Sequence, residues 1–294
     1  MPLGVIPPSR AAPYLRVMKP VAVITGTTQG IGRVVARRLA EAGLHVVMLC
    51  RDRVAARRLC EQWCAQDARL SFDAVHCDLS SLSSVRNAAA AVLGDHAHLQ
   101  LLVNNAGTIS MKHRRSADGF ELCFAVNHLG PFLLTELLRD RITAGGRIVN
   151  TASRVHAKAR KFDVEAFIDP GAPYRAGAAY AQSKLANVLH TLALVRRLEG
   201  SGITANCLHP GVVATSLLPR WLRSLKSLWD PVILDATQGA STTLKLSLAP
   251  GLDGVTGRYF DEYGLPQEPS SLARNIDLQE RLWNQSRSWC GLPT

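Results

Sequence analysis

A glycine-rich turn between a short apolar run and an amphipathic helix constrains the fold of this chain more than any other stretch. The run from Val21 to Thr25 is apolar and rich in β-branched residues, which is typical of a strand buried on both faces. The turn Gly26-Thr27-Thr28-Gln29-Gly30-Ile31-Gly32 follows it, then a helical pattern to Gly43 and a second apolar run, His45 to Cys50. Strand, helix and strand in this order predict a βαβ unit with parallel strands.

The same turn is a candidate phosphate-binding site. Glycines let the backbone approach a pyrophosphate closely, and the N-terminus of the following helix offers N–H groups and the positive end of its dipole. The candidate cofactor contacts in this G-x-x-x-G-x-G turn are Gly26, Thr28, Gln29, Gly30, Ile31 and Gly32.

Strand-like and helical patterns continue to alternate along the chain. Further strands are expected at 72–77, 99–104, 146–153, 203–209 and 258–260, and helices at 80–93, 120–141, 178–198 and 270–290. The last of these helices is expected to pack through Leu272, Ile276, Leu282 and Trp283. The alternation predicts an α/β fold with one Rossmann-type domain, a doubly wound parallel sheet covered by helices on both faces.

Ligands collect at the carboxyl ends of the strands in such a sheet. The residues predicted to lie at those ends are Gly26, Arg51, Asp78, Asn105, Ser153 and Pro210. Further candidate cofactor contacts adjoin them, namely Asp52, Leu79, Ala106, Gly107, Gly211 and Val213. Their convergence on one edge of the sheet is the main physical argument for a single site.

Domain limits follow from the same patterns. Residues 1–18 are rich in proline and contain no apolar run long enough for a signal peptide or a membrane span, so we expect a flexible N-terminal arm. Residues 19–294 are expected to form one domain, with a substrate lid at about 212–235.

Composition narrows the class of protein. With 47% hydrophobic and 19% charged residues the chain should fold as a soluble protein. The net charge of +11 suits nucleic acid, an anionic cofactor or a membrane surface, but the arginines are scattered without interleaved aromatics, so no nucleic-acid partner is expected. The seven cysteines form no C-x-x-C pair and lack histidines at ligand spacing, which indicates reduced thiols, a cytoplasmic location and no metal site.

Tyr180 and Lys184 are four residues apart in a predicted helix, so their side chains share one face. A free phenol has a pKa near about 10, and a fixed ammonium beside it favours the phenolate and lowers that pKa. The pair could therefore exchange a proton at neutral pH, although a surface Tyr/Lys pair is the commoner origin of this spacing.

Arg51-Asp52 follows the second strand, where dinucleotide-binding folds meet the adenosine ribose. An arginine there suits the 2′-phosphate of NADP and an acid suits the free hydroxyl of NAD. Because Arg51 comes first, NADP(H) is favoured, with NAD(H) as the alternative.

Taken together, these residues closely resemble the short-chain dehydrogenase/reductase family, and most of all its retinol-dehydrogenase-like branch, over roughly Lys19 to Asp261. The matching motifs, in order, are Thr25-Gly26-x-x-x-Gly30-Ile31-Gly32, Asn104-Asn105-Ala106-Gly107, Asp118-Gly119-Phe120-Glu121, Val126-Asn127-His128-Leu129-Gly130, Ser153, Tyr180-x-x-x-Lys184-Leu185-Ala186-Asn187-Val188 and His209-Pro210-Gly211-Val212-Val213.

The resemblance implies a role for each motif residue. Tyr180 would be the general acid or base, Ser153 would hold the substrate oxygen, and Lys184 would lower the pKa of Tyr180 and bind the nicotinamide ribose. Asn127 would hold a water that relays protons. The cofactor-binding set would be the turn glycines with Arg51, Asp78, Asn105, Ala106, Gly107, Tyr180, Lys184, Pro210, Gly211 and Val213. A homo-oligomer, a dimer or tetramer, is also implied.

Two stretches leave alternatives open. Residues 154–179 form a longer insertion than most of the family has, either a solvated basic loop or a rim of the substrate entrance. In 220–230, Trp221, Leu225 and Trp229 share a helical face, which suits a lid over a small lipophilic carbonyl or alcohol substrate, a peripheral membrane contact, or a core-packed helix. The predicted function is an NADP(H)-dependent oxidoreductase, and the rival is a non-catalytic NADP-binding sensor or scaffold.

Overall fold

The apolar runs of the chain pair into one mixed sheet of eight strands. The structure is a computed structural model that describes residues 19–164, 167–168, 173–213 and 233–293. The strand order is β10-β9-β6-β5-β4-β1-β2-β3, and every neighbouring pair is parallel except β9 and β10. The strands are β1 (Val21–Thr25), β2 (His45–Cys50), β3 (Ser71–His76), β4 (Leu99–Asn104), β5 (Ile142–Thr151), β6 (Thr204–Leu208), β9 (Tyr259–Phe260) and β10 (Pro266–Gln267).

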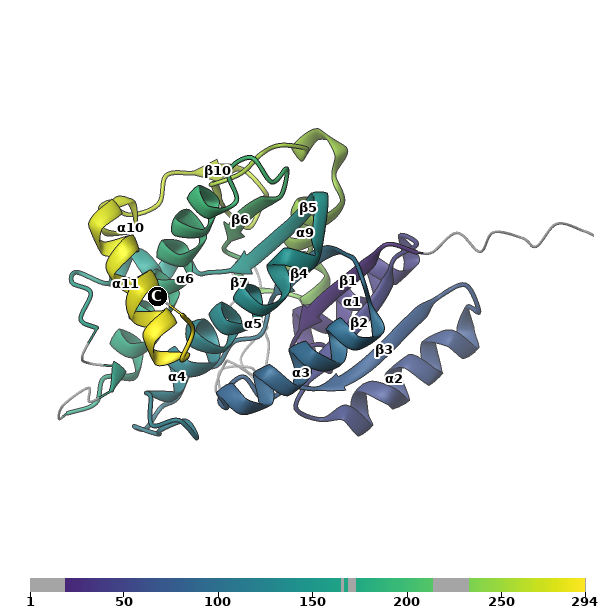
Figure 1. Ribbon diagram of the computed structural model, residues 1–294, viewed down its shortest axis with the longest axis horizontal. Coiled ribbons are helices and arrows are strands. Elements are labelled where there is room, and N and C mark those ends of the chain that lie inside the picture. The colour runs from purple at the N-terminus through teal and green to yellow at the C-terminus, as the bar shows by residue number, and fades with distance from the viewer. Residues whose placement is uncertain (1–18, 165–166, 169–172, 214–232, 294) are drawn as a thin grey trace, which may run out of the picture.

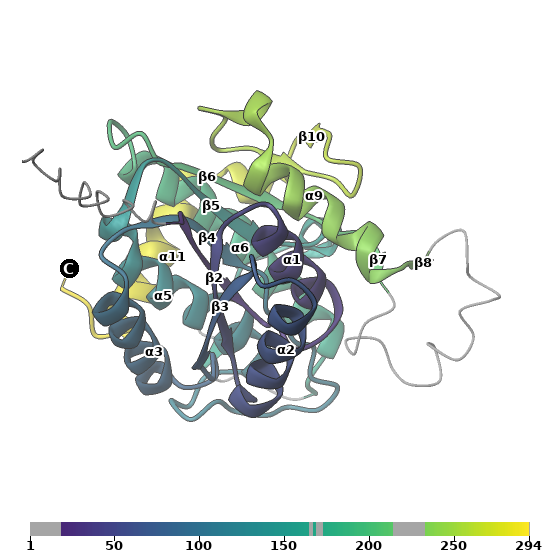
Figure 2. The same ribbon diagram turned by 90° about the vertical axis from the view of Figure 1, so that its right-hand side faces the viewer.

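Helices cover both faces of this sheet, as Figure 2 shows. One layer consists of α1 (Gly30–Glu41), α2 (Arg53–Gln66) and α9 (Ala236–Leu248), and the other of α3 (Leu82–Asp95), α5 (Gly130–Leu138), α6 (Ala176–Arg197) and α11 (Ile276–Trp289). Each layer has its own apolar core, one around Leu39 and Trp63 and one around Leu133 and Leu185. The predicted doubly wound α/β sheet is confirmed.

The remaining helical elements are short. They are α4 (Leu122–Phe124), the π-helical turn η1 (Ala125–Leu129), the 3₁₀ turns η2 (Arg139–Arg141), η3 (Arg154–Lys158) and η5 (Pro250–Leu252), and α10 (Ser271–Arg274). A second, two-stranded parallel sheet joins β7 (Val212–Val213) to β8 (Ile233–Leu234).

The strand order reverses its direction of growth at β1, and this positions the site. The chain builds β1, β2 and β3 toward one edge, and then returns to place β4 on the other side of β1. Connections that leave the carboxyl ends of β1 and β4 therefore diverge, which opens a crevice at the end of these two strands. Figure 1 shows β1, β4 and β5 side by side, with α6 and α5 beside them.

The structure also departs from the expected elements. Helices α2 and α9 were not predicted, and β5 begins at Ile142 rather than at 146. Ile276 was expected on the buried side of the last helix, but its side chain is 60% exposed, and Leu278 packs there with Leu282 and Trp283 instead.

Several expectations about domain limits stay predictions. The N-terminal arm and the segment 220–230 lie outside the described residues, so the structure places neither. The two ends of the predicted lid are described. They pair as the parallel strands β7 and β8, with Val212 opposite Ile233 and Val213 opposite Leu234. No described helix is both long and apolar enough to span a membrane.

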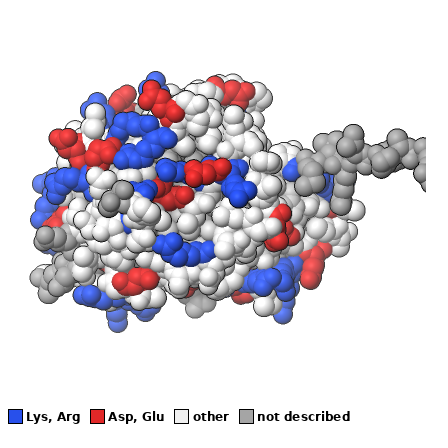
Figure 3. Space-filling view, in the orientation of Figure 1, with Lys and Arg blue, Asp and Glu red and all other residues white. Residues whose placement is uncertain are grey.

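Charges of both signs are interspersed on the surface. On the face drawn in Figure 3, Lys and Arg alternate with Asp and Glu rather than gathering into one basic area. Two arginines share one acidic partner, since Arg196 and Arg197 both contact Glu280, with Arg197 Nη2 2.6 Å from the carboxylate. All seven cysteines are free thiols, and five of them are buried.

Candidate active site

Helix α6 carries Tyr180 and Lys184 to the carboxyl edge of the sheet. The Lys184 side chain is 2% exposed, and its Nζ donates a hydrogen bond to the carbonyl oxygen of Thr151, the last residue of β5, at 2.9 Å. Asn187, one turn further along α6, donates to the same carbonyl at 3.0 Å. Helix α6 is thus fixed against the end of β5 by two polar bonds, which sets the position of its functional face.

Burial changes the protonation of Lys184. A buried ammonium loses hydration, and this lowers the pKa of Lys184 to about 8. Its Nζ lies 5.8 Å from the centroid of the Tyr180 ring. The Lys184 ammonium, which the sequence predicts to support Tyr180 electrostatically, therefore loses its proton nearer to neutral pH than an ordinary lysine does.

Tyr180 does not show the lowered pKa that the sequence predicted. Burial raises the pKa of Tyr180 to about 12, and a hydrogen bond with Ser153 opposes this rise without cancelling it. The i, i+4 spacing suggested an ammonium beside the hydroxyl, but Lys184 donates to the Thr151 carbonyl and faces the tyrosine ring. In this structure Tyr180 is a neutral phenol and a potential proton donor, and the expectation of a depressed pKa is wrong.

Ser153 lies two residues beyond β5 and begins the turn η3. Its side chain is 7% exposed, and its Oγ accepts a hydrogen bond from the backbone N–H of Val155 at 3.4 Å. Because the N–H of Val155 occupies only one acceptor lone pair, the hydroxyl keeps its own proton and a second lone pair for the bond with Tyr180 that acts on the phenol. The structure thus brings Ser153 and Tyr180 together, as the motif required.

Asn127 lies in the π-helical turn η1, where one extra residue widens the helix. Its Nδ2 donates to the carbonyl of Thr108 and to Oγ of Ser183, both at 2.9 Å, and its Oδ1 accepts from the N–H of Thr108 at 2.7 Å. Turns of this kind occur frequently at functional sites. Asn127 therefore joins η1, the loop after β4 and helix α6 around Lys184, while its expected role in holding a water stays a prediction.

The glycine-rich turn is closely packed against the loop after β4. Gly32 has no room for a side chain, because a Cβ would lie 2.2 Å from the carbonyl oxygen of Gly26 and 2.4 Å from Nδ2 of Asn105. Gly26 has φ +74°, in the left-handed region that favours glycine. The turn therefore brings the start of α1 against β1 more closely than any other residue would permit.

Asn105 and Thr25 hold this turn in place. Asn105 Nδ2 donates to the carbonyl of Thr25 at 2.9 Å, and Thr25 Oγ1 accepts from the N–H groups of Asn105 and Ala106, both at 3.0 Å. Asn105 was predicted to line the adenosine side of a cofactor, and here its side chain connects the ends of β1 and β4 across the crevice.

These residues fit a dinucleotide. The first turn of α1 contains no acidic residue, so its N-terminus suits an anion. At Gly107 a Cβ would lie 3.4 Å from both Lys184 Nζ and Asn127 Oδ1, so the glycine keeps open the space beside the ammonium. The same edge therefore offers a phosphate-binding turn at one end and the proton-bearing residues at the other.

The two ends of the predicted lid pack against the turn. A Cβ on Gly239 of α9 would lie 2.5 Å from Val213 Cγ2 and 3.2 Å from Ile31 Cδ1. Gly211 has φ +82° and lies against Leu234. Ile31 and Val213 therefore both lie against Gly239, which was not foreseen because α9 itself was not predicted.

Arg51 and Asp52 both lie exposed after β2, and the Asp52 side chain is engaged in a helix cap. Asp52 caps α2, accepting a hydrogen bond from the N–H of Ala55 at 2.8 Å. Asp78 is occupied by a local turn, since its Oδ1 accepts from the N–H and the hydroxyl of Ser80 at 2.9 and 2.7 Å. Leu79 is buried and its carbonyl lies against Gly130.

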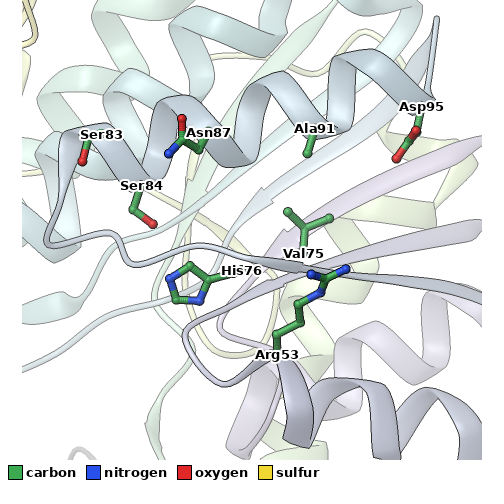
Figure 4. Close-up of a pocket in the computed structure, with 8 residues that line it drawn as sticks. All are labelled: Arg53, Val75, His76, Ser83, Ser84, Asn87, Ala91 and Asp95. Carbon is green, nitrogen blue, oxygen red and sulfur yellow. The ribbon is translucent and has the colours of Figure 1, made fainter.

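A groove of about 480 Å³ lies beside this adenosine end, between α3 and the edge strand β3. Figure 4 shows Ser83, Asn87, Ala91 and Asp95 along one face of α3, opposite Arg53, Val75 and His76. His76 contacts the carbonyl of Arg51 at 2.9 Å, and Ser84 Oγ accepts from the N–H of Asp78 at 2.9 Å. The groove thus adjoins the predicted adenosine contacts but is separate from Tyr180 and Lys184.

The long insertion after Ser153 is exposed along much of its described length and is anchored to the fold at two aromatic residues. Phe167 is 2% exposed and stacks on Phe124, with ring centroids 3.7 Å apart. The hydroxyl of Tyr174 donates to the buried carboxylate of Glu121 at 2.9 Å. The basic side chains Arg154, Lys158, Arg160, Lys161 and Arg175 are all exposed, as expected of a solvated basic loop, and the alternative role as a rim of the substrate entrance stays a prediction.

Sequence reasoning assigned no structural role to three residues that assemble the site. Thr25 holds the loop after β4, Ser183 accepts from Asn127, and Gly239 leaves room for Ile31 and Val213. Ser183 could have been found, because it lies between Tyr180 and Lys184. The other two act across distant parts of the sequence.

Known proteins are similar to this chain in sequence and in fold. Residues 20–166 match the family described as short chain dehydrogenase. Retinol dehydrogenase 12 of Bos taurus is 38% identical over 278 residues, which cover 92% of this chain and 86% of that protein. Short-chain dehydrogenase TIC 32 B, chloroplastic, of Brassica napus is 38% identical over 281 residues, 90% and 87% of the two chains.

Solved structures of other proteins have a similar fold. An uncharacterized protein from Mycobacterium paratuberculosis has a TM-score of 0.76 and 30% identity, covering 94% of this chain and 96% of that one. A blue fluorescent protein from a metagenomic library, solved in complex with NADPH, has a TM-score of 0.67 and 26% identity, covering 83% and 96%.

Replacing Gly32 by alanine tests the close packing of the turn. Because the new methyl would overlap the Gly26 carbonyl and Asn105, we expect Gly32→Ala to weaken NADPH binding at least tenfold and to lower the unfolding free energy by roughly 1–3 kcal/mol. Binding is measured by NADPH fluorescence and stability by urea unfolding.

Gly94→Ala is the matched control, since Gly94 is also helical and a Cβ there would meet nothing within 4 Å. It should leave binding unchanged and stability equal or slightly higher. Equal behaviour of the two variants would contradict the tight packing at Gly32.

Proposed function

The chain belongs to the short-chain dehydrogenase family, and from that premise we propose that it interconverts a carbonyl and an alcohol on an apolar small molecule with NADP(H). Family membership makes it an NAD(P)-dependent oxidoreductase. The observation that carries the finer proposal is the meeting of Tyr180, Ser153, Lys184 and Asn127 at one edge of the sheet, beside the glycine turn.

Each residue has a distinct task in this proposal. The bound coenzyme supplies or accepts the hydride, which is chemistry that protein side chains lack. In reduction, the Tyr180 hydroxyl donates its proton to the carbonyl oxygen, and in oxidation the phenolate takes the proton of the alcohol. Ser153 Oγ would donate a hydrogen bond to the same oxygen and stabilise the negative charge that develops there.

Lys184 supports the proton transfer through its charge. While protonated, it stabilises the tyrosinate that is left when Tyr180 gives up its proton. The Thr151 carbonyl holds the ammonium at 2.9 Å, so the charge is already in position before substrate binds. Asn127 keeps the surrounding loop and η1 in register through its three hydrogen bonds.

Arg51 supports NADP(H) over NAD(H). It is exposed directly after β2, whereas the neighbouring carboxylate of Asp52 is engaged in capping α2. A guanidinium can bind a 2′-phosphate through two parallel hydrogen bonds, and an acid that serves as a helix cap competes less for the ribose. The structural relative solved with NADPH agrees with this choice without deciding it.

The apolar substrate is supported by the names of relatives. A retinol dehydrogenase is 38% identical to this chain, and retinol is a lipophilic primary alcohol. The TIC 32 B relative is equally similar, however, and its name gives no substrate. Retinoid-sized aldehydes and alcohols are therefore the first substrates to assay, followed by other lipophilic carbonyls and alcohols. The cytoplasmic location, the homo-oligomer and any peripheral membrane contact stay predictions.

Replacing Tyr180 by phenylalanine tests the proposed proton donor. With the hydroxyl gone, we expect kcat for NADPH-dependent reduction of lipophilic aldehydes to fall at least 100-fold, the lower end of what general acid catalysis contributes. NADPH binding, followed by fluorescence, should change less than threefold (on the order of 0.6 kcal/mol).

A chain that binds NADPH tightly but turns over no aldehyde, ketone or alcohol above the Tyr180→Phe background would contradict the proposal. That result would favour the rival, a non-catalytic NADP-binding sensor or scaffold.

Removing the Arg51 guanidinium tests the coenzyme preference. Loss of a charge-assisted contact to the 2′-phosphate should raise KM for NADPH by about tenfold or more, with KM for NADH nearly unchanged, in steady-state assays of Arg51→Ala. Asp52→Asn is the control, because asparagine also caps a helix. It should leave the ratio of the two KM values unaltered, and a change of coenzyme preference in Asp52→Asn alone would reverse the assignment.

A further inference from the structure

Two histidines and an aspartate meet at the sheet edge opposite to the active site. His45 is the first residue of β2, Asp73 is the third residue of the edge strand β3, and His96 directly follows α3. Functional residues of this fold lie at the carboxyl ends of the strands, whereas His45 lies at the amino end of its strand. The cluster is therefore remote from Tyr180 and Lys184, and the reaction proposed above does not use it.

The three side chains point their ligand atoms at one another. Nε2 of His45 lies 2.9 Å and Nε2 of His96 lies 3.3 Å from the same oxygen, Oδ2 of Asp73. All three ligand atoms lie within 4.8 Å of one another. The imidazoles are largely covered, with side chains 17% and 14% exposed, while the carboxylate is 47% exposed and reachable from solvent.

The two separations from Asp73 are close to those of ligands around a small divalent cation. At Zn–N and Zn–O distances near 2.0–2.1 Å, ligand atoms at the corners of a tetrahedron lie roughly 3.3–3.4 Å apart. The distances from Asp73 to the two histidines, 2.9 and 3.3 Å, are already close to that value. Small rotations of three partly solvated side chains would place their atoms around one ion.

A second set of contacts suits His45 for this task. Its other ring nitrogen, Nδ1, lies 2.7 Å from Oγ of Ser71, its register partner in β3. With the proton on Nδ1 donated to Ser71, the Nε2 lone pair faces Asp73 and is available to a metal. Metal-bound histidines commonly have their second nitrogen fixed by such a partner.

We propose that His45, Asp73 and His96 form a Zn²⁺-binding site whose fourth position is left to water. Two imidazoles and one carboxylate are typical zinc donors, and three protein ligands with an open position are a known coordination for this ion. The sequence predicted no metal because its cysteines lack histidines at ligand spacing, and these three residues are too far apart in sequence to form a motif.

The position of the site implies a structural effect. The ion would connect the end of α3 to the start of β2 and to the edge strand β3, two strands that already pair in the sheet. An ion that binds the folded chain alone stabilises it by mass action. Zinc should therefore raise the melting temperature and leave the coenzyme site unchanged.

Titration of the full chain with zinc chloride tests the proposal. After dialysis against a chelator and then chelator-free buffer, calorimetry should show one Zn²⁺ per chain. At a zinc concentration 100 times Kd, the melting temperature should rise by roughly 5 °C. Asp73→Asn and His96→Gln should each weaken binding at least tenfold and abolish the thermal shift.

Three controls keep the result specific. His98→Gln removes an exposed histidine just outside the cluster and should bind zinc like the wild type. Cys60→Ser tests for capture by thiols, and a Co²⁺ adduct should lack the intense near-ultraviolet charge-transfer band of thiolate ligation. NADPH binding, measured at the remote edge of the sheet, shows whether the Asp73 and His96 variants remain folded.

Stoichiometric binding that His96→Gln and Asp73→Asn weaken, with the variants still folded, supports the site. The proposal is overturned if zinc does not bind, if folded His96→Gln binds it as tightly as wild type, or if only Cys60→Ser removes binding. Those outcomes would leave the cluster as a hydrogen-bonded group of two imidazoles around one carboxylate.

Discussion

The site depends on the hydrogen bond that holds the buried ammonium of Lys184 at the end of β5. A lysine that is 2% exposed must keep its charge with few water molecules, so its surroundings have to provide polar contacts. The carbonyl of Thr151 accepts its hydrogen bond, and Oδ1 of Asn127 lies near the same space beside Gly107. The end of β5, the loop after β4 and helix α6 are thereby fixed relative to one another. Tyr180 lies on this helix and Ser153 two residues beyond β5, so the same contacts fix their positions.

The second constraint is steric and acts at the other end of the crevice. Gly32 lets α1 begin directly against the Gly26 carbonyl, and Asn105 bonds to that same stretch of backbone. A single side-chain oxygen, Thr25 Oγ1, then holds two backbone N–H groups of the loop after β4. The phosphate-binding turn and the proton-bearing residues are thus parts of one connected edge, because the same loop, 104–107, contacts both.

Local patterns in the sequence were enough to predict the fold and the family, while the catalytic and coenzyme roles of the site residues stay predictions. Strands such as 21–25 and 99–104 were predictable because each is a short apolar run between turn residues. Helix α9 was missed because its buried positions are mostly small or polar, including Gly239, Ala240 and Thr243, so its apolar periodicity is weak. Its capping box, Asp235 with Gln238, was the available signal.

Features that depend on burial or on distant contacts were not predictable. The spacing of Tyr180 and Lys184 indicates a shared face, but it contains no information on how far each group is removed from water, so the direction of the Tyr180 pKa shift was wrong. The π-helical turn around Asn127 rests on bonds to Thr108 and Ser183, which only the folded chain brings together. The His45, Asp73 and His96 cluster likewise arises from three separate elements.

The central claim is that a charged Lys184 supports proton donation by a neutral Tyr180, and the pH dependence of kcat/KM for carbonyl reduction tests it most directly. This parameter reports the ionisations of the free enzyme. The pKa of Lys184, lowered to about 8, means that the ammonium is present below that pH and lost above it, while Tyr180, with a pKa of about 12, keeps its proton throughout. The account predicts a level kcat/KM at lower pH that declines above about pH 8. A profile that stays level up to the ordinary lysine pKa near about 10.4, or that rises between these values, would contradict it.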